Sequence, residues 1–204
     1  MKPNFSHYHA PIVNDDALDI IFREGRSFSY WQEKPVSDVL LHALYDLVKM
    51  GPTSANSCPM RVVFIKTSSA KEKLKPALDA GNIEKTMTAP VTAIIAYDRL
   101  FYNQLPQLFP HANARDWFAH DQEKADKAAL HGSTLQAAYL FLAARSLGLD
   151  CGPMQGFNAA LVDELFLTGS EWKSNLLCNI GYGDRDKLHP RQPRLEFGEA
   201  CRII

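Results

Sequence analysis

Three short apolar runs predict the strands of the fold. The first, residues 61–66, reads Arg-Val-Val-Phe-Ile-Lys and is rich in β-branched residues, which favour strands. Residues Val91–Tyr97 and Leu176–Tyr182 form two further runs that predict buried strands.

Helical spacing of apolar positions predicts the segments between these strands. A short helix is expected from about Asp16 to Phe22. A second opens at Ser37 and Asp38 and ends before Gly51-Pro52, because Gly and Pro stop helices; its apolar positions are Leu40, Leu44, Leu47 and Val48. Ser69 and Glu72 have the spacing of a capping box, which predicts a third helix through about Leu78.

A long helix is predicted from about residue 125 to 147, with Gly148 as its stop. It is apolar on nearly every side after Leu130, so it must be enclosed by the centre of the fold or by another subunit. Helices that alternate with strands in this way predict an α/β or α+β sheet with helical layers. We expect one domain over residues 1–204, with about residues 1–12 as a loose N-terminal arm.

Composition and charge exclude several classes of protein. The chain has 22 Lys and Arg against 23 Asp and Glu, and this balance disfavours nucleic acid as a partner. The longest apolar stretch, Leu135–Leu147, is too short and too interrupted to span a membrane. The four cysteines are dispersed without a CxxC pair, so no metal site is expected. With no signal peptide at the N-terminus, we expect reduced thiols and a cytoplasmic protein.

Familiar catalytic signatures are absent: the chain has no Walker A, GxSxG or HExxH sequence, and its glycines do not form a Rossmann fingerprint. Four segments nevertheless carry groups that suit a phosphorylated, polar ligand. They are Arg26–Ser29, Pro52–Asn56, Asn82–Lys85 and Gly152–Phe157. Taken singly, each segment is more often structural than functional: a helix cap, a turn or a solvent-exposed pair of charged side chains. The residues alone therefore predict only an α/β domain with a possible anion site.

Taken together and in this order, the segments resemble the nitroreductase family of flavin enzymes. Residues Gly51–Pro59 are similar to the family's Pro-Ser-x-x-Asn block, and residues 153–157 match its Pro-x-x-Gly-Phe loop after the long helix. Asn82-x-x-Lys85 and the C-terminal Arg191-x-Pro193 also fit. Within the family, residues 50–56, 108–111 and 173–184 resemble the malonic semialdehyde reductases of the Rut pyrimidine-degradation pathway.

The resemblance implies an α+β, three-layer nitroreductase-like fold with a central mixed sheet flanked by helices. It also implies a homodimer with non-covalent FMN at the subunit interface and NADH or NADPH as co-substrate. The long helix would then be a buried dimer-interface helix.

Site residues follow by resemblance, position by position. Arg26 and Arg191 would hold the FMN phosphate, with Ser27 or Ser29 nearby. The flavin would be reached from the partner chain by a further set: Pro52, Thr53, Ser54 and Asn56. Asn82 and Lys85 would address the ring and ribityl side. The loop that includes Pro153 and Met154 would place the backbone amides of Gln155 and Gly156 against flavin N5.

The chain departs from the family pattern after Arg26, where Ser29 and Tyr30 occupy the region of a second basic residue. This loss puts more weight on Lys85 as the cation that stabilises the reduced ring. No side chain is expected to act as a nucleophile, because hydride passes through flavin N5.

The function implied is reduction of a small electrophile by ping-pong hydride transfer, with malonic semialdehyde giving 3-hydroxypropionate. Arg115 or Arg99 is the candidate cation for the substrate carboxylate. A general NAD(P)H nitro- or quinone reductase is the first alternative. A flavin-binding module without turnover is the second, from another class.

Overall fold

The computed structural model describes residues 12–204 and is built on one four-stranded sheet in the order β1-β2-β4-β3. The strands are β1 (Met60–Ile65), β2 (Val91–Asp98), β3 (Asp150–Met154) and β4 (Trp172–Gly181). Apart from its last residue, the predicted N-terminal arm lies outside the described residues. The three predicted strands are confirmed as β1, β2 and β4, and β4 begins four residues earlier than expected.

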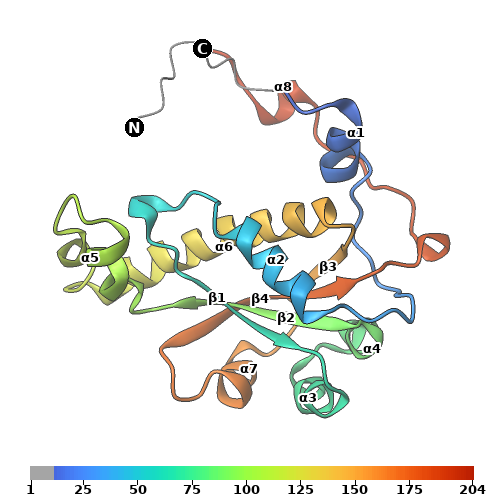
Figure 1. Cartoon of the computed structure of the whole chain (residues 1–204), viewed down its shortest axis with the longest axis horizontal. Helices are drawn as coiled ribbons and strands as arrows, with labels where there is room; N and C mark the ends of the chain where they lie inside the picture. The colour runs from blue at the N-terminus through green and yellow to red at the C-terminus, as the bar shows by residue number, and fades with distance from the viewer. Residues whose placement is uncertain (1–11) are drawn as a thin grey trace.

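Helices cover both faces of the sheet, so the predicted three-layer architecture is confirmed (Figure 1). One face carries α2 (Asp38–Val48) and α6 (Gln122–Ser146), and the other carries α3 (Ser68–Leu74), α4 (Ala80–Thr88) and α7 (Ala159–Phe166). Alternate residues of β4 divide between the two cores. Cys178 and Ile180 pack with α2 and α6, whereas Leu177 packs with α3 and α7.

Short elements complete the described chain. α1 (Asp15–Leu18) continues into a π-helical turn, Asp19–Arg23, in place of the predicted single helix. α5 (Leu105–Leu108) lies between two 3₁₀ turns, Phe101–Gln104 and Ala114–Trp117, and α8 (Phe197–Ala200) lies near the C-terminus. Within residues 12–204 no helix is both long and apolar enough to cross a membrane.

The helix caps agree with the sequence in one case and differ in another. Ser37 caps α2 by accepting a hydrogen bond from the backbone N–H of Leu40, as predicted. The cap of α3 is Thr67, whose hydroxyl accepts from the N–H of Ala70, so the predicted cap at Ser69 is wrong. α3 also ends at Leu74 rather than Leu78, because Pro76 has no N–H to continue the helix and the chain tightens into a 3₁₀ turn.

The sheet itself requires a correction. A mixed sheet was expected, but β1, β2, β4 and β3 pair antiparallel throughout. The parallel contribution is an isolated bridge between Ser27 and Cys151, at the outer edge of β3. The sequence predicts a loop at residues 153–157, whereas Pro153 and Met154 belong to the edge strand β3. An edge strand tolerates proline, because the missing N–H faces the open side and breaks no hydrogen bond to β4.

Helix α6 is buried on one side only. Its inward face is made of small and polar residues and Leu140, and the opposite face exposes Leu130, Leu135 and Tyr139 by 39%, 53% and 40%. Gly148 follows the helix with a φ of 73°, a conformation that favours glycine and ends helices. Its predicted role as the stop is confirmed. Of the two expected ways to enclose this helix, the centre of the fold covers only one side, and the apolar residues of the other side are exposed in the single chain.

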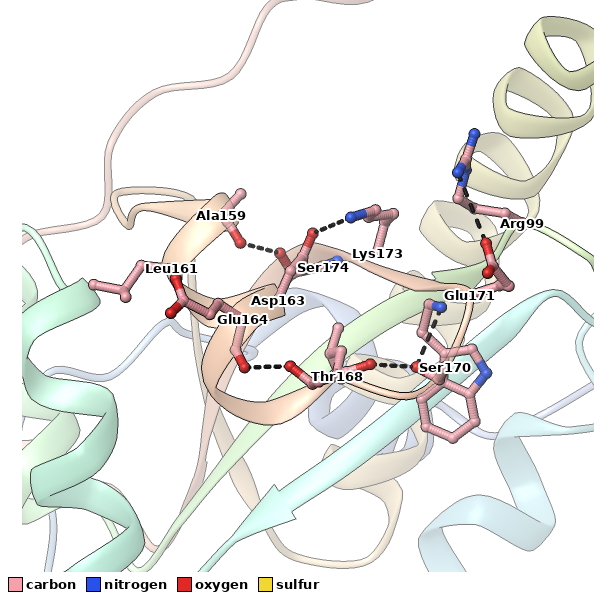
Figure 2. A network of polar contacts seen from close by, with 12 residues as sticks. Arg99, Ala159, Leu161, Asp163, Glu164, Thr168, Ser170, Glu171, Lys173 and Ser174 are labelled. Atoms are coloured by element: carbon pink, nitrogen blue, oxygen red, sulfur yellow. Dashed lines mark hydrogen bonds and ion pairs between the residues drawn. The ribbon is translucent and has the colours of Figure 1, made fainter.

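Polar contacts fix α7 against the beginning of β4 (Figure 2). The carboxylate of Asp163 accepts the backbone N–H of Ser174 at 2.8 Å and pairs with the ammonium of Lys173 at 3.3 Å. The hydroxyl of Ser174 donates to the carbonyl of Ala159 at 3.3 Å. These contacts explain why β4 begins at Trp172, in a polar stretch that the apolar pattern did not include.

A buried lysine fastens α3 to the end of α4. Lys71 is 4% exposed, and its ammonium donates to the carbonyls of Thr86, at 2.8 Å, and Ala89. Within the described residues no carboxylate pairs with it. Burial lowers the pKa of Lys71 to about 8 from the usual 10.5, because the charged form loses water.

This lysine predicts a pH-dependent stability. Between pH 8 and 10.5 the unfolded chain keeps a proton on Lys71 that the folded chain releases, so folding becomes more favourable as pH rises. Relative to Lys71→Met, the wild-type free energy of unfolding should increase by about 1–2 kcal/mol from pH 7.5 to 9.5, measured by urea unfolding. Lys73→Met, at an exposed position of the same helix, is the control and should leave the pH profile of the wild type unchanged. A constant difference between wild type and Lys71→Met would contradict the assignment.

Candidate functional site

The N-terminal segment 26–31 crosses the outer edge of β3 and begins the candidate site. The backbone N–H of Phe28 donates to the carbonyl of Cys151 at 3.0 Å, and the Phe28 side chain is buried. The carbonyl of Phe28 lies so close to Gly152 that a Cβ there would be 2.4 Å from it. The glycine at position 152 therefore admits the chain's own backbone, whereas in the sequence it belongs to a segment that suits a polar ligand.

Two arginines from opposite ends of the chain meet at this edge. Arg26 donates to the carbonyl of His189, and Arg191 donates to the carbonyls of Arg23 and Gly25 at 2.6 and 3.2 Å. Each guanidinium thus holds the segment that carries the other. The structure confirms that these two predicted residues, far apart in sequence, lie together.

Basic groups around Arg26 include residues that the sequence reasoning missed. A cavity of about 50 Å³ is lined by Arg26, Ser27, Ser29 and also Lys187, whose ammonium lies 5.3 Å from the ring centre of Tyr30. A larger cavity of about 420 Å³ begins at Gly25 and is lined by Arg145 and Arg185, together with the carboxylates of Glu24 and Asp150. The ammonium of Lys187 pairs with the carboxylate of Asp184, which lines the same cavity, at 3.3 Å. The sequence feature that could have identified Lys187 is its position just before the C-terminal arm that carries Arg191.

The buried Nε of Arg145 has no hydrogen-bond partner among the described residues. Its Nη1 donates to the carbonyl of Ile21 at 2.8 Å, which fixes the guanidinium behind Gly25. The charge of this guanidinium adds to the positive potential at this end of the site.

Helix α4 supplies the other end of the site. The side-chain amide of Asn82 donates to the carbonyl of Gly156 at 2.7 Å, and the N–H of Asp79 donates to the same carbonyl at 3.1 Å. A Cβ at Gly156 would lie 2.6 Å from the Asn82 amide, so only glycine allows this approach. Burial lowers the pKa of Lys85, one turn further along α4. Segments 82–85 and 153–157 therefore meet, as predicted.

The side chains of segment 153–156 are divided between core and surface. Met154 is 7% exposed and packs in the core with Leu177 and Ile94. Its side chain is therefore unavailable to a ligand, and only its backbone is left for the predicted cofactor-binding role. Pro153 and Gln155 are exposed at the edge of the sheet.

The fourth predicted segment lies elsewhere in the same chain. The amide of Asn56 donates to the carbonyl of Leu108 in α5 at 2.9 Å, and the hydroxyl of Thr53 accepts the N–H of Cys58 at 3.0 Å. Asn56 has a positive φ of 50°, and Pro52 and Ser54 are exposed. The structure thus brings three of the four segments together in one chain and places residues 52–56 on α5 and α6.

The two candidate cations for a substrate carboxylate differ in availability. Arg99 makes a bidentate contact with Asp126, with Nε and Nη2 each 3.0 Å from a carboxylate oxygen, so it is occupied. Arg115 bonds Asn103 through Nε at 3.2 Å and keeps an exposed guanidinium. Its Nη1 lies 3.8 Å from the carboxylate of Asp116, so Arg115 is less tightly paired than Arg99 and is the more available of the two.

The described residues contain no cluster of three or more His, Cys, Asp or Glu that could hold a metal ion. The cations at one end and the amides at the other instead define an elongated polar site along β3. A model of the nitroreductase family matches residues 23–182, which include segments 26–29, 52–56, 82–85 and 153–157. The chain belongs to the nitroreductase family.

Relatives and solved structures agree with this membership. A protein of Ralstonia nicotianae, named as a candidate NADH dehydrogenase/NAD(P)H nitroreductase, is 55% identical over 95% of this chain and 100% of its own. An NAD(P)H:FMN oxidoreductase candidate from Staphylococcus epidermidis has a TM-score of 0.81, with 18% identity over 97% of this chain and 100% of its own. A candidate nitroreductase of Exiguobacterium sibiricum, solved in complex with FMN, has a TM-score of 0.80, with 17% identity over 95% and 99% of the two chains.

The family is FMN-dependent and uses NAD(P)H as reductant, so the predicted cofactor and co-substrate are confirmed at the level of the family. The nitroreductase-family protein described here is accordingly an NAD(P)H oxidoreductase. The donor set at the edge of β3 fits FMN. The guanidinium groups of Arg26 and Arg191 suit a phosphate, and Gly156 carries no side chain that would obstruct a ring.

The close approach at Gly152 predicts a stability effect. In Gly152→Ala the new Cβ meets the backbone carbonyl of Phe28 at 2.4 Å, and the crossing segment must shift. We expect the free energy of unfolding to fall by about 1–3 kcal/mol, measured by urea unfolding. Gly81→Ala in α4 is the matched control, because no atom lies within 4 Å of its Cβ, and it should stabilise by about 0.5–1 kcal/mol. Equal effects at the two glycines would contradict this packing.

Proposed function

We propose that this protein uses FMN and NAD(P)H to reduce malonic semialdehyde to 3-hydroxypropionate. The observation that carries the FMN site is the meeting of segments 26–29, 82–85 and 153–157 at the edge of β3, with Arg191 beside them. The substrate rests on the resemblance of residues 50–56, 108–111 and 173–184 to malonic semialdehyde reductases. We take the chain as one FMN-binding domain.

In this proposal Arg26, Arg191, Ser27 and Ser29 bind the FMN phosphate. Asn82 and Lys85 bind the ring and ribityl side, and the backbone amides of Gln155 and Gly156 face N5. FMN, when bound, supplies a hydride acceptor and donor between NAD(P)H and the substrate. The Lys85 ammonium stabilises negative charge on the pyrimidine side of the ring. Net reduction adds a hydride to the aldehyde carbon and a proton to its oxygen.

We further propose that the working form is a homodimer. The exposed apolar residues of α6 and the exposed C-terminal arm, residues 189–204, lack a covering surface within the chain. Residues Pro52, Thr53, Ser54 and Asn56 would then serve the partner's FMN, which agrees with their separation from the other three segments in one chain.

A general nitro- or quinone reductase is the second candidate, favoured by the name of the 55% identical relative. The visible spectrum of the purified protein separates the candidates. We expect a yellow protein that bleaches with anaerobic NADH or NADPH and recovers its oxidised spectrum with malonic semialdehyde.

Other outcomes of this experiment each have one meaning. Recovery only with a quinone or nitroarene supports the general reductase. Bound FMN that neither nicotinamide reduces supports a flavin-binding module without turnover. A colourless protein that ignores added FMN contradicts the proposed function.

The exposed and loosely paired guanidinium of Arg115 predicts a substrate-specific effect. Arg115→Gln should raise KM for malonic semialdehyde about tenfold, because a charge-assisted contact to the carboxylate is lost, and should change KM for a neutral quinone less than about twofold. Steady-state kinetics with both substrates checks this. Lys75→Gln, at an exposed position just after α3, is the control. A parallel rise for both substrates would exclude Arg115 as the carboxylate ligand.

A further inference from the structure

The last turn of α4 is satisfied by side chains from three other parts of the chain. A helix leaves its final carbonyls without intrahelical donors, and α4 ends at Thr88 with Ala89 extended. The carbonyl of Lys85 accepts from the indole Nε1 of Trp31 and from the amide Nδ2 of Asn179, both at 3.0 Å. The carbonyl of Thr86 accepts from Lys71. The backbone of Lys85 is thus held by two donors at once.

Trp31 is held in a slot formed by two glycines. A Cβ at Gly152 in β3 would lie 3.2 Å from its ring, and a Cβ at Gly181 in β4 would lie 3.1 Å from it. The Phe28 ring packs on the indole with centroids 6.3 Å apart. These contacts aim the indole N–H at α4, and they join α4 to the segment that carries Arg26.

Asn179 is held in one orientation within the sheet. Its side chain is fully buried, and its Oδ1 accepts the hydroxyl of Thr92 at 2.7 Å. This bond turns the NH₂ group toward α4, where it reaches the carbonyl of Lys85 and, at 3.3 Å, the hydroxyl of Thr86. A flipped amide would face the carbonyl of Lys85 with an oxygen, so only one orientation satisfies the group.

We propose that Trp31 and Asn179 are positioning residues of the FMN site, which act by fixing the carbonyl of Lys85 and thereby its ammonium. The inference rests on the proposed function, in which Lys85 contacts the flavin. Because Trp31 belongs to segment 26–31, its hydrogen bond also sets the spacing between the phosphate end and the ring end of the site. Neither residue touches FMN in this assignment.

A double-mutant cycle tests this role in the full-length protein. Trp31→Phe keeps an aromatic ring and removes the N–H donor, and should raise the Kd for FMN about fivefold by fluorescence titration. In a Lys85→Ala background the same change should alter Kd less than about twofold, since the group it positions is gone. Trp31→Phe should also move the flavin reduction potential in the same direction as Lys85→Ala does.

Controls separate this inference from the proposed function. Trp172→Phe makes the same substitution outside the site and should change neither Kd nor potential. If Trp31→Phe does not fold, Asn179→Ser enters the same cycle with the same expectation. An equal effect of Trp31→Phe with and without Lys85 overturns the positioning role and leaves the FMN site intact. Unchanged FMN binding in Lys85→Ala alone, or no FMN binding by the wild type, overturns the proposed role of Lys85 and the inference with it.

Discussion

The hydrogen bond from the N–H of Phe28 to the carbonyl of Cys151 is the contact on which the site depends. It holds an irregular segment across the edge of a sheet, where unpaired backbone groups would otherwise face solvent. On one side of this bond Arg26 reaches the C-terminal segment, and on the other Trp31 reaches α4. A single backbone crossing therefore joins the chain's two ends and the helix of Asn82 and Lys85. The demand for glycine at position 152 follows directly from it.

The interior of the sheet carries polar groups for a related reason. Thr92, Asn179 and Thr86 are fully buried, at a cost in desolvation unless every donor and acceptor is paired. They are paired with one another and with the end of α4. The cluster thus replaces apolar packing with hydrogen bonds that fix the position of α4. Lys71 of α3 also fixes the end of α4, by donating to the carbonyl of Thr86. Such an arrangement fixes the end of α4 relative to the sheet.

Much of the framework was predictable because apolar runs and helical spacing report burial directly. β1, β2, most of β4, α2 and α6 follow from that signal. β3 did not, because Gly152 and Pro153 obscure a strand whose residues are chosen for close approach and for an open edge. α7 was missed as well, and the cap of α3 was misplaced by two residues.

The site was predictable as separate segments but not as an assembly. Arg26, Asn82, Lys85, Gly156 and Arg191 were identified singly, yet their meeting depends on β3 pairing with β4, a long-range choice that local pattern does not report. Lys187, Trp31 and Asn179 were missed for the same reason. The roles of these side chains depend on contacts with residues far away in sequence, such as the carbonyl of Lys85.

The exposed apolar face of α6 and the loop of residues 52–56 adjoin each other on the surface of the chain. Tyr139 lies on the exposed face of α6, and Gly51 approaches its ring so closely that a Cβ would be 2.7 Å from it. Residues 52–56 follow immediately, separated from the cations and amides at the edge of β3. A second copy that covers the apolar face of α6 would therefore also meet this loop. In the proposed dimer, burial of α6 and completion of the FMN site would be one event, since the apolar area that would drive association adjoins the polar residues assigned to the partner's site.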